Sequence, residues 1–157
     1  MSLETGRAPL APEIPILAPT AEFIWEAVVE IAPTMMLGAG PQGERRMVPI
    51  TGGRFEGPRI KGRILPGGAD RQLVRPDGVR RLEALYELET DDGAVITVLN
   101  QVVAAPRDGE ADYRFSTLQV TAPEGRYGWL NRLAFVGTLN SLRPARDAVV
   151  IRVFALG

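Results

Sequence analysis

The chain has 157 residues, of which 45% are hydrophobic and 24% charged, and its net charge is −1 at neutral pH. These values are typical of one globular domain, and they argue against disorder, a fibrous assembly or an overall attraction to nucleic acid. The sequence contains neither cysteine nor histidine, which excludes a Ser-His-Asp triad, a Cys-His pair, disulfides, and zinc, haem or iron–sulfur sites with their usual ligands.

The sequence also gives expectations about cofactors and about cellular location. It predicts no metal site and no cofactor, and a Schiff-base mechanism would rest on Lys61, the single lysine. No segment approaches the roughly 18 uncharged apolar residues that a membrane-spanning helix needs. The N-terminus carries Glu4 and Arg7 before a proline-broken stretch, unlike a secretory signal. We therefore expect a cytoplasmic protein with no nucleic-acid partner and no membrane partner.

Residues 1–19 are expected to form an extended arm that precedes a single β-domain of residues 20–157. Proline fixes φ and lacks a backbone donor, so this arm should not join the middle of a sheet. Its apolar side chains favour a position on a protein surface, such as that of a neighbouring subunit, and we expect a homo-oligomer. The prolines concerned are Pro9, Pro12, Pro15 and Pro19.

Beyond the arm, apolar and charged residues alternate with the period of a half-buried strand. Between residues 22 and 31 one side is apolar, while Glu22, Glu26 and Glu30 fall on the other. Residues 82–88 repeat the pattern, and no strong helix is predicted. Other β-rich segments are separated mostly by turn residues, and they cover residues 45–51, 59–65, 71–75, 94–104, 112–121, 132–138 and 148–155.

Two joints between these segments carry the Asp-Gly signature of a tight reversal, at residues 76–78 and 91–93. Sequential strands should therefore pair antiparallel. Because about nine strands in one domain would leave exposed edges unless the sheet closed, we expect an all-β fold, a single antiparallel barrel with little helix. A barrel of this size has room for one small-molecule ligand.

A glycine-rich region runs through residues 52–57 and 62–70 and ends on Asp70. A phosphate-binding loop would need a helix after it, whereas β-rich sequence follows here. Paired glycines instead allow positive φ and close backbone approach, so they place the next side chain where an ordinary loop would not. Asp70 is then either a turn cap or, in an apolar barrel mouth with a raised pKa, a general acid or base.

Residues 126–131 combine flat apolar rings with polar tips, as the wall of a ligand pocket does. The alternative is that Tyr127 and Trp129 plug one end of the barrel and that Asn131 ties down a loop. Asp91 and Asp92 precede Gly93, which favours a turn over a catalytic carboxylate pair. The alternating basic residues of 59–63 are typical of the solvent-exposed face of a strand.

These motifs together resemble the family known as domain of unknown function 3237, also called uncharacterised protein family 0311. The resemblance covers residues 20–155 and is carried by the sequences at 52–57, 66–70, 91–94 and 127–131. It implies a streptavidin-like or lipocalin-like antiparallel barrel. Asp70 is the candidate catalytic residue within its motifs, and the candidate ligand-binding residues are Arg54, Tyr127, Trp129 and Asn131.

Some fungal members of this family are associated with cyclisation or isomerisation in polyketide pathways, which implies acid–base chemistry on an aromatic or enolic substrate. The chain departs from the family pattern at residues 100–102 and 115–118, which argues against a pocket role for the central strands. Three functions stay open: a cofactor-free isomerase, lyase or cyclase in which Asp70 moves a proton; a non-catalytic carrier or sensor of an apolar or aromatic ligand; and a structural homo-oligomer without a ligand.

Overall fold

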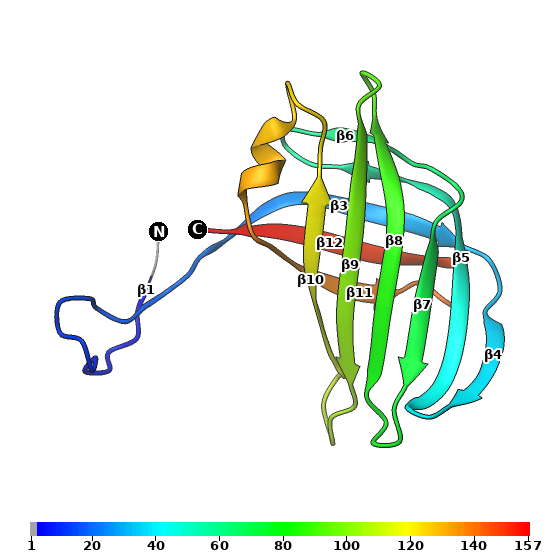
Figure 1. Ribbon diagram of the computed structural model, residues 1–157, viewed down its shortest axis with the longest axis horizontal. Helices are drawn as coiled ribbons and strands as arrows, with labels where there is room; N and C mark the ends of the chain where they lie inside the picture. The colour runs from blue at the N-terminus through cyan, green and yellow to red at the C-terminus, as the bar shows by residue number, and fades with distance from the viewer. Residues whose placement is uncertain (1–2) are drawn as a thin grey trace.

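The computed structural model describes residues 3–157, which are built mainly of antiparallel strands (Figure 1). Within this range the helical structure is one short 3-10 segment, η1 (Gly128–Arg132), and no helix is long and apolar enough to cross a membrane. The strands of the main sheet are β3 (Ala21–Ile31), β4 (Met35–Gly40), β5 (Gly43–Glu56), β6 (Lys61–Ile64), β7 (Ala69–Val74), β8 (Arg80–Thr90), β9 (Val95–Ala105), β10 (Tyr113–Thr121), β11 (Phe135–Ser141) and β12 (Ala148–Leu156).

Backbone pairing closes these strands into an eight-stranded antiparallel barrel. β3 pairs with β12 on one side and with β5 on the other, which closes the ring and removes the exposed edges of an open sheet. At two positions in the ring, two shorter strands take the place of one long strand. β3 and β4 follow one another along one side of β5, and β6 and β7 follow one another between β5 and β8. The predicted barrel is confirmed.

Glycines in the middle of β5 let this strand change partners. Its first half pairs with β4 and β7, and its second half with β3 and β6. A Cβ at Gly53, whose φ is +132°, would lie 2.0 Å from the Val28 carbonyl oxygen, and the register with β3 shifts next to Glu30. Only glycine allows this close crossing. β5 therefore continues to Glu56 instead of ending at residue 51 as the sequence predicted.

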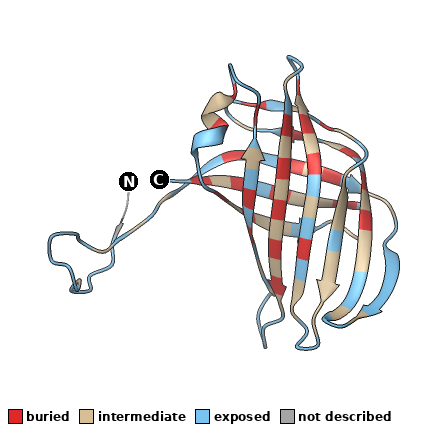
Figure 2. Ribbon diagram, in the orientation of Figure 1, coloured by how far each residue is buried: buried red, intermediate tan, exposed pale blue. Residues whose placement is uncertain are grey.

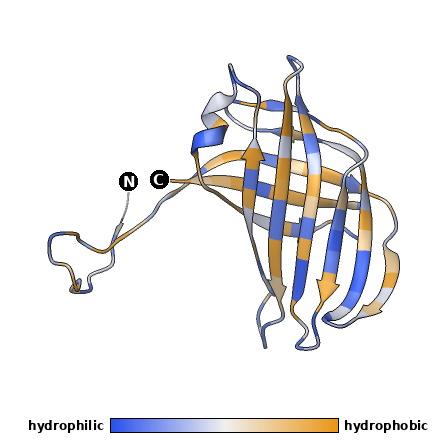
Figure 3. Ribbon diagram, viewed as in Figure 1, coloured by the Kyte–Doolittle hydropathy of each residue, from blue (hydrophilic) through white to orange (hydrophobic). Residues whose placement is uncertain are grey.

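The barrel interior contains a large apolar cluster and, toward the end opposite η1, a smaller one formed by Leu82, Val102 and Ala104. In Figure 2 β7 is drawn mostly as partly buried, whereas β9 is crossed by fully buried positions, and Figure 3 shows the polar middle of β7. Large apolar side chains of the core include Trp25, Phe55, Leu88, Ile96, Leu130 and Phe135. These clusters supply the hydrophobic stabilisation, and Asp70 lies opposite the buried Val48.

Residues 3–19 extend away from the barrel (Figure 1). They form a separate small hairpin in which β1 (Leu3–Glu4) pairs with β2 (Leu17–Ala18), a pairing that the proline pattern did not indicate. Leu10 and Ile14 are exposed between these two strands. The position of this arm on a neighbouring subunit stays a prediction.

Candidate functional site inside the barrel

Asp70 lies on β7 and faces the inside of the barrel. Directly paired residues in an antiparallel sheet point to the same face. Asp70 is opposite Val48 of β5 and Ala84 of β8, and Ala84 is opposite Asn100 of β9. Val48 and Asn100 are buried, with 4% and 1% of their surface exposed. Asp70 and Asn100 therefore belong to one inward-facing row that crosses four neighbouring strands.

The glycine-rich loop between β6 and β7 sets this position. Gly67 has a φ of +108°, and a Cβ at Gly68 would lie 2.6 Å from the Leu85 carbonyl oxygen and 2.6 Å from the Tyr86 Cβ. The loop backbone thus lies directly against β8 at Tyr86, and two residues later Asp70 points to the face that Tyr86 occupies. A strand follows the loop, so the helix required by a phosphate-binding loop is missing, as the sequence predicted.

The two oxygens of the Asp70 carboxyl group have different surroundings. Oδ2 accepts a hydrogen bond of 2.9 Å from the Gln72 side-chain amide, whereas Oδ1 is out of contact with solvent and has no hydrogen-bond partner. Burial raises the pKa of Asp70, against the opposing effects of the Gln72 hydrogen bond, the Arg80 charge and an interaction with the Glu83 backbone. Oδ1 is therefore the oxygen best placed to hold or transfer a proton.

Asp70 is one of several inward-facing residues with a buried polar atom that no protein group satisfies. Such atoms are uncommon in folded proteins, and a functional site is one of the usual reasons for them. Tyr86 and Trp25 have 1% and 0% of their surface exposed, and Ser116 has 5%. The unpartnered atoms are Trp25 Nε1, Arg46 Nε, Asp70 Oδ1, Tyr86 Oη, Asn100 Oδ1, Arg114 Nε and Ser116 Oγ. We call these seven residues the interior polar set.

The raised pKa of Asp70 has a consequence for stability. Because the folded-state pKa lies above the unfolded value of about 3.8, the ionised carboxylate destabilises the fold at pH values above the folded pKa, and this cost disappears below about pH 3.8. We expect Asp70→Asn to raise the free energy of unfolding near pH 7 by about 1 kcal/mol, or about 2–4 °C in Tm. Urea denaturation near pH 7 and pH 3.5 measures this, and a variant less stable than the wild type near pH 7 would contradict the buried-carboxylate account.

Tyr127 lies at the other end of the barrel, next to the turn between β8 and β9. Its side chain is buried in the core, and its hydroxyl donates a 2.8 Å hydrogen bond to Asp92 Oδ1. Asp92 also accepts from the Thr90 hydroxyl at 2.5 Å and from Arg126 at 3.0 Å. The Thr90 and Tyr127 hydrogen bonds lower the pKa of Asp92, while burial and then the Asp92 hydrogen bond raise the pKa of Tyr127. This geometry supports a turn anchored to the core.

The other predicted ligand-binding residues are also placed away from Asp70. Trp129 lies in η1 with the Arg59 guanidinium 3.8 Å from its ring centroid. The Asn131 side chain exchanges hydrogen bonds of 2.8 and 2.9 Å with the backbone of Ala122, as in the loop-tying alternative. Arg54 is exposed, because it alternates with the buried Phe55 on β5.

The structure thus separates the predicted site residues into different regions. Asp70 is level with Ala84 on β8, and the turn containing Asp92 begins beyond Thr90, six residues further along this strand. At about 3.4 Å per residue the two ends are roughly 20 Å apart. A polar cleft of about 350 Å³ adjoins Tyr127 at the η1 end. The structure does not bring Arg54, Tyr127, Trp129 and Asn131 to Asp70, and their role in ligand binding stays a prediction.

Comparison with known proteins assigns the fold to a family. The family model described as a protein of unknown function, DUF3237, matches residues 19–156. The chain belongs to the DUF3237 family. The UPF0311 protein RPA1785 of Rhodopseudomonas palustris is 34% identical over 152 residues, covering 87% of this chain and 97% of the relative. Its crystal structure superposes with a TM-score of 0.81 and covers 89% of this chain and 99% of that one.

Two further relatives of this DUF3237 chain are informative. A β-barrel-like protein of Acinetobacter baumannii has a crystal structure with a TM-score of 0.80, 33% sequence identity, and coverage of 88% of this chain and 96% of that chain. A protein of Penicillium herquei named as a hydroalkoxylation enzyme is 29% identical over 120 residues, covering 76% of this chain and 74% of the relative. One protein similar to this chain is thus named as an enzyme.

Substitution of Tyr127 distinguishes an anchoring role from a ligand-binding role in this DUF3237 barrel. Tyr127→Phe keeps the ring in the core and removes the hydrogen bond to Asp92. We expect a loss of about 1–2 kcal/mol in the free energy of unfolding, with ligand affinity in the interior unchanged. Thermal unfolding and calorimetric titration measure the two quantities. A large loss of affinity with unchanged stability would instead assign Tyr127 to a ligand site.

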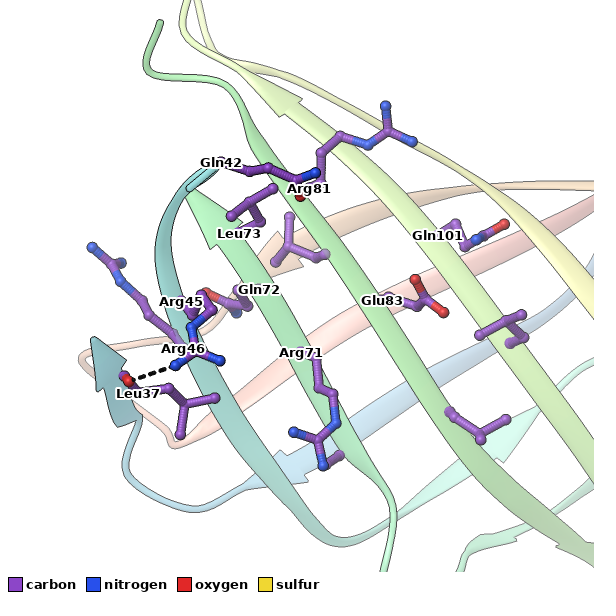
Figure 4. Close-up of a pocket in the computed structure, with 14 residues that line it drawn as sticks. Leu37, Gln42, Arg45, Arg46, Arg71, Gln72, Leu73, Arg81, Glu83 and Gln101 are labelled. Carbon is purple, nitrogen blue, oxygen red and sulfur yellow. Dashed lines mark hydrogen bonds between the residues drawn. The ribbon is translucent and has the colours of Figure 1, made fainter. Parts of the chain in front are cut away.

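A groove of about 780 Å³ lies on the outside of the DUF3237 barrel (Figure 4). Arg71 of β7 lines the groove, and Arg46 and Gln72, which belong to an inward-facing row, line it as well. Leu85 contributes an apolar side chain that is 54% exposed, and Arg45 donates a 3.1 Å hydrogen bond to the Leu37 carbonyl at one edge. Asp70 is not among the residues that line the groove, although its hydrogen-bond partner Gln72 is.

Sequence reasoning missed Asn100 and Ser116, two members of the interior polar set. The departures from the family pattern at 100–102 and 115–118 argued against a pocket role, yet the structure turns both side chains inward and buries them. A usable signal was present. Every second residue of β9 is buried, and Asn100 is a polar residue at one of these otherwise apolar positions. A buried amide at such a position requires a hydrogen-bond partner. In residues 3–157 no three acidic side chains gather closely enough to hold a metal ion.

Proposed function

We propose that this protein is a cofactor-free acid–base catalyst in which Asp70 moves a proton on an unsaturated or enolic small molecule held inside the barrel. The observation that carries the proposal is the Asp70 carboxyl group, whose Oδ1 is buried, faces the interior and has no protein partner. Burial raises the pKa of this carboxyl group, so at a given pH a larger fraction of it is protonated than in an exposed aspartate.

The Penicillium herquei relative supports a particular reaction class, addition of a hydroxyl group across a carbon–carbon double bond. In this chain, Asp70 Oδ1–H would donate its proton to one alkene carbon, and the π electrons form the new C–H bond. The substrate's own hydroxyl oxygen then forms a C–O bond with the cationic carbon, and its proton returns to Asp70. The substrate is isomerised without oxidant, reductant or cofactor, which suits a chain without cysteine or histidine.

Two other members of the interior polar set have side chains suited to positioning the substrate hydroxyl. Burial, and next the Asp70 charge, raise the pKa of Tyr86, so its phenol stays neutral and donates a hydrogen bond. Asn100 contributes an amide oxygen that accepts one. A donor and an acceptor on adjacent inward-facing strands hold an attacking oxygen close to the alkene, and such positioning is itself a large part of catalysis.

The reaction is tested with 2-(2-methylprop-2-enyl)phenol, a small phenol whose hydroxyl lies next to a disubstituted alkene. Incubation in D₂O near neutral pH is expected to yield 2,2-dimethyl-2,3-dihydrobenzofuran with one deuterium in a methyl group, at a rate above that of buffer. NMR and mass spectrometry detect the product. A rate equal to that of buffer for this phenol and for its enolic analogues would contradict catalysis.

The interior polar set also supports ligand binding without turnover, because its unpartnered atoms satisfy a bound molecule whether or not a proton moves. In that case the phenol would bind in the interior and be recovered unchanged. The cytoplasmic location and the homo-oligomeric state accompany the proposal as predictions from composition and from the apolar arm.

A further inference from the structure

We propose that the ligand carries a carboxylate, which inward-facing arginines bind at the end of the barrel opposite η1 while the reactive group reaches Asp70. The role of Asp70 in this inference rests on the proposed function, whereas the carboxylate site stands on separate residues. These are Arg46, Arg80 and Arg114, and we call their end of the barrel the arginine end.

The strand register turns all three arginines toward the interior. Arg46 of β5 is opposite Gln72 of β7, which is opposite the buried Leu82 of β8. Arg80 of β8 and Arg114 of β10 are both opposite Ala104 of β9, which is 3% exposed. Since paired residues share a face, each guanidinium group begins on the inner wall.

Two of these guanidinium groups keep a donor free for a ligand. Nε of Arg46 and Nε of Arg114 are buried and make no hydrogen bond with the protein. The same side chains are 30% and 33% exposed, so their ends are reached from solvent. A guanidinium group binds a carboxylate with two parallel hydrogen bonds through donors in a fixed geometry, which fits a buried Nε–H beside an accessible terminal nitrogen.

The acidic residues near the arginine end do not cancel its charge when Asp70 is protonated. Glu44 lies 3.7 Å from Arg46, and Asp112 lies 3.4 Å from Arg114. The charge of Arg80 opposes the increase of the pKa of Asp70. Among these residues, three guanidinium groups accompany two carboxylates and the acid form of Asp70, which leaves one positive charge uncompensated. A bound anion also favours the protonated state of Asp70 that proton donation needs.

The spacing between the two regions defines the length of the ligand. Asp70 and Gln72 are two residues apart on β7, and Arg46 is level with Gln72. Two residues of strand correspond to about 7 Å, close to the length of a benzene ring with substituents at opposite positions. This spacing matches a ligand in which a carboxylate and a hydroxyl group lie at opposite ends of one ring.

The test compares 4-hydroxy-3-(2-methylprop-2-enyl)benzoate with its uncharged carboxamide, by calorimetric titration of the full-length chain. We expect the carboxylate to bind about 10- to 100-fold more tightly, as expected for a charge-assisted pair. Arg46→Gln and Arg114→Gln should each remove most of this difference. Arg71→Gln, on the outer face of β7, is the matched control and should leave both affinities unchanged. Because the carboxamide comparison uses wild-type protein, it stays decisive if a variant fails to fold.

The outcomes separate this inference from the proposed function. Equal affinities for the carboxylate and the carboxamide, or a difference that survives both arginine substitutions, would overturn the carboxylate site even if Asp70 cyclises either compound. A carboxylate preference that depends on Arg46 and Arg114, in a protein that converts neither compound, would support the site and reject catalysis. Failure of the carboxylate to bind at all would overturn the inference.

Discussion

Asp70→Asn is expected to lower the turnover of 2-(2-methylprop-2-enyl)phenol by about 10²- to 10⁴-fold, the usual contribution of a general acid. Asparagine keeps the shape of the side chain but has no proton to donate to the alkene carbon. Affinity should change by less than about threefold, because the other members of the interior polar set stay in place. Steady-state kinetics gives turnover, and calorimetric titration gives affinity.

The control for this variant is Asp77→Asn. Asp77 is an exposed aspartate of the turn between β7 and β8, hydrogen-bonded to Arg75 and to the Val79 amide. It shares the residue type and the neighbouring strand but lies outside the barrel, so turnover should match the wild type. Full turnover by Asp70→Asn would remove Asp70 from the mechanism, and equal losses in both variants would indicate a general effect on folding.

Gly68→Ala, in the loop before Asp70, should cause a large loss of stability. Its new Cβ would lie 2.6 Å from both the Leu85 carbonyl oxygen and the Tyr86 Cβ, which real contacts do not allow. The loop must shift, and we expect a loss of about 1–3 kcal/mol in the free energy of unfolding, or several degrees in Tm at about 2–4 °C per kcal/mol. Denaturant titration measures the loss.

Gly128→Ala is the matched control, because a Cβ there meets no atom within 4 Å and the backbone of η1 is unstrained. Its free energy of unfolding should stay within about 0.5 kcal/mol of the wild type. The displacement at Gly68 should also move Asp70, so turnover should fall in Gly68→Ala and not in Gly128→Ala. A stable, fully active Gly68→Ala protein would show that the loop does not position Asp70.

The barrel was largely predictable from the sequence because its physical causes are local. Alternation between residues 22 and 31 and between 82 and 88 placed β3 and β8, and the Asp-Gly turns at 76–78 and 91–93 predicted the pairing of β7 with β8 and of β8 with β9. β4 escaped prediction because its exposed, glycine-containing segment lacks alternation. The η1 turn, part of which fell in an expected strand at residues 132–138, closes one end of the barrel through packing of Leu130.

The site was only partly predictable, because it depends on which distant strands become neighbours. The glycine loop pointed to Asp70, since paired glycines before a charged residue have a local steric explanation. Arg46 and Arg114 join the same interior only through the register of β5 with β7 and of β9 with β10. Tyr127 and Asn131 are close to each other in sequence and make a plausible pocket wall, yet their partners are Asp92 and Ala122, away from Asp70.

The two tryptophans offer the most direct test of where this barrel binds its ligand. Trp25 has a buried, unpartnered indole N–H inside the barrel, whereas Trp129 lies in η1 with its ring against Arg59. A ¹H–¹⁵N spectrum therefore contains two indole signals, which Trp129→Phe assigns. Titration with 4-hydroxy-3-(2-methylprop-2-enyl)benzoate is predicted to shift the Trp25 signal and leave the Trp129 signal in place. A shift of the Trp129 signal alone would contradict a functional site in the interior.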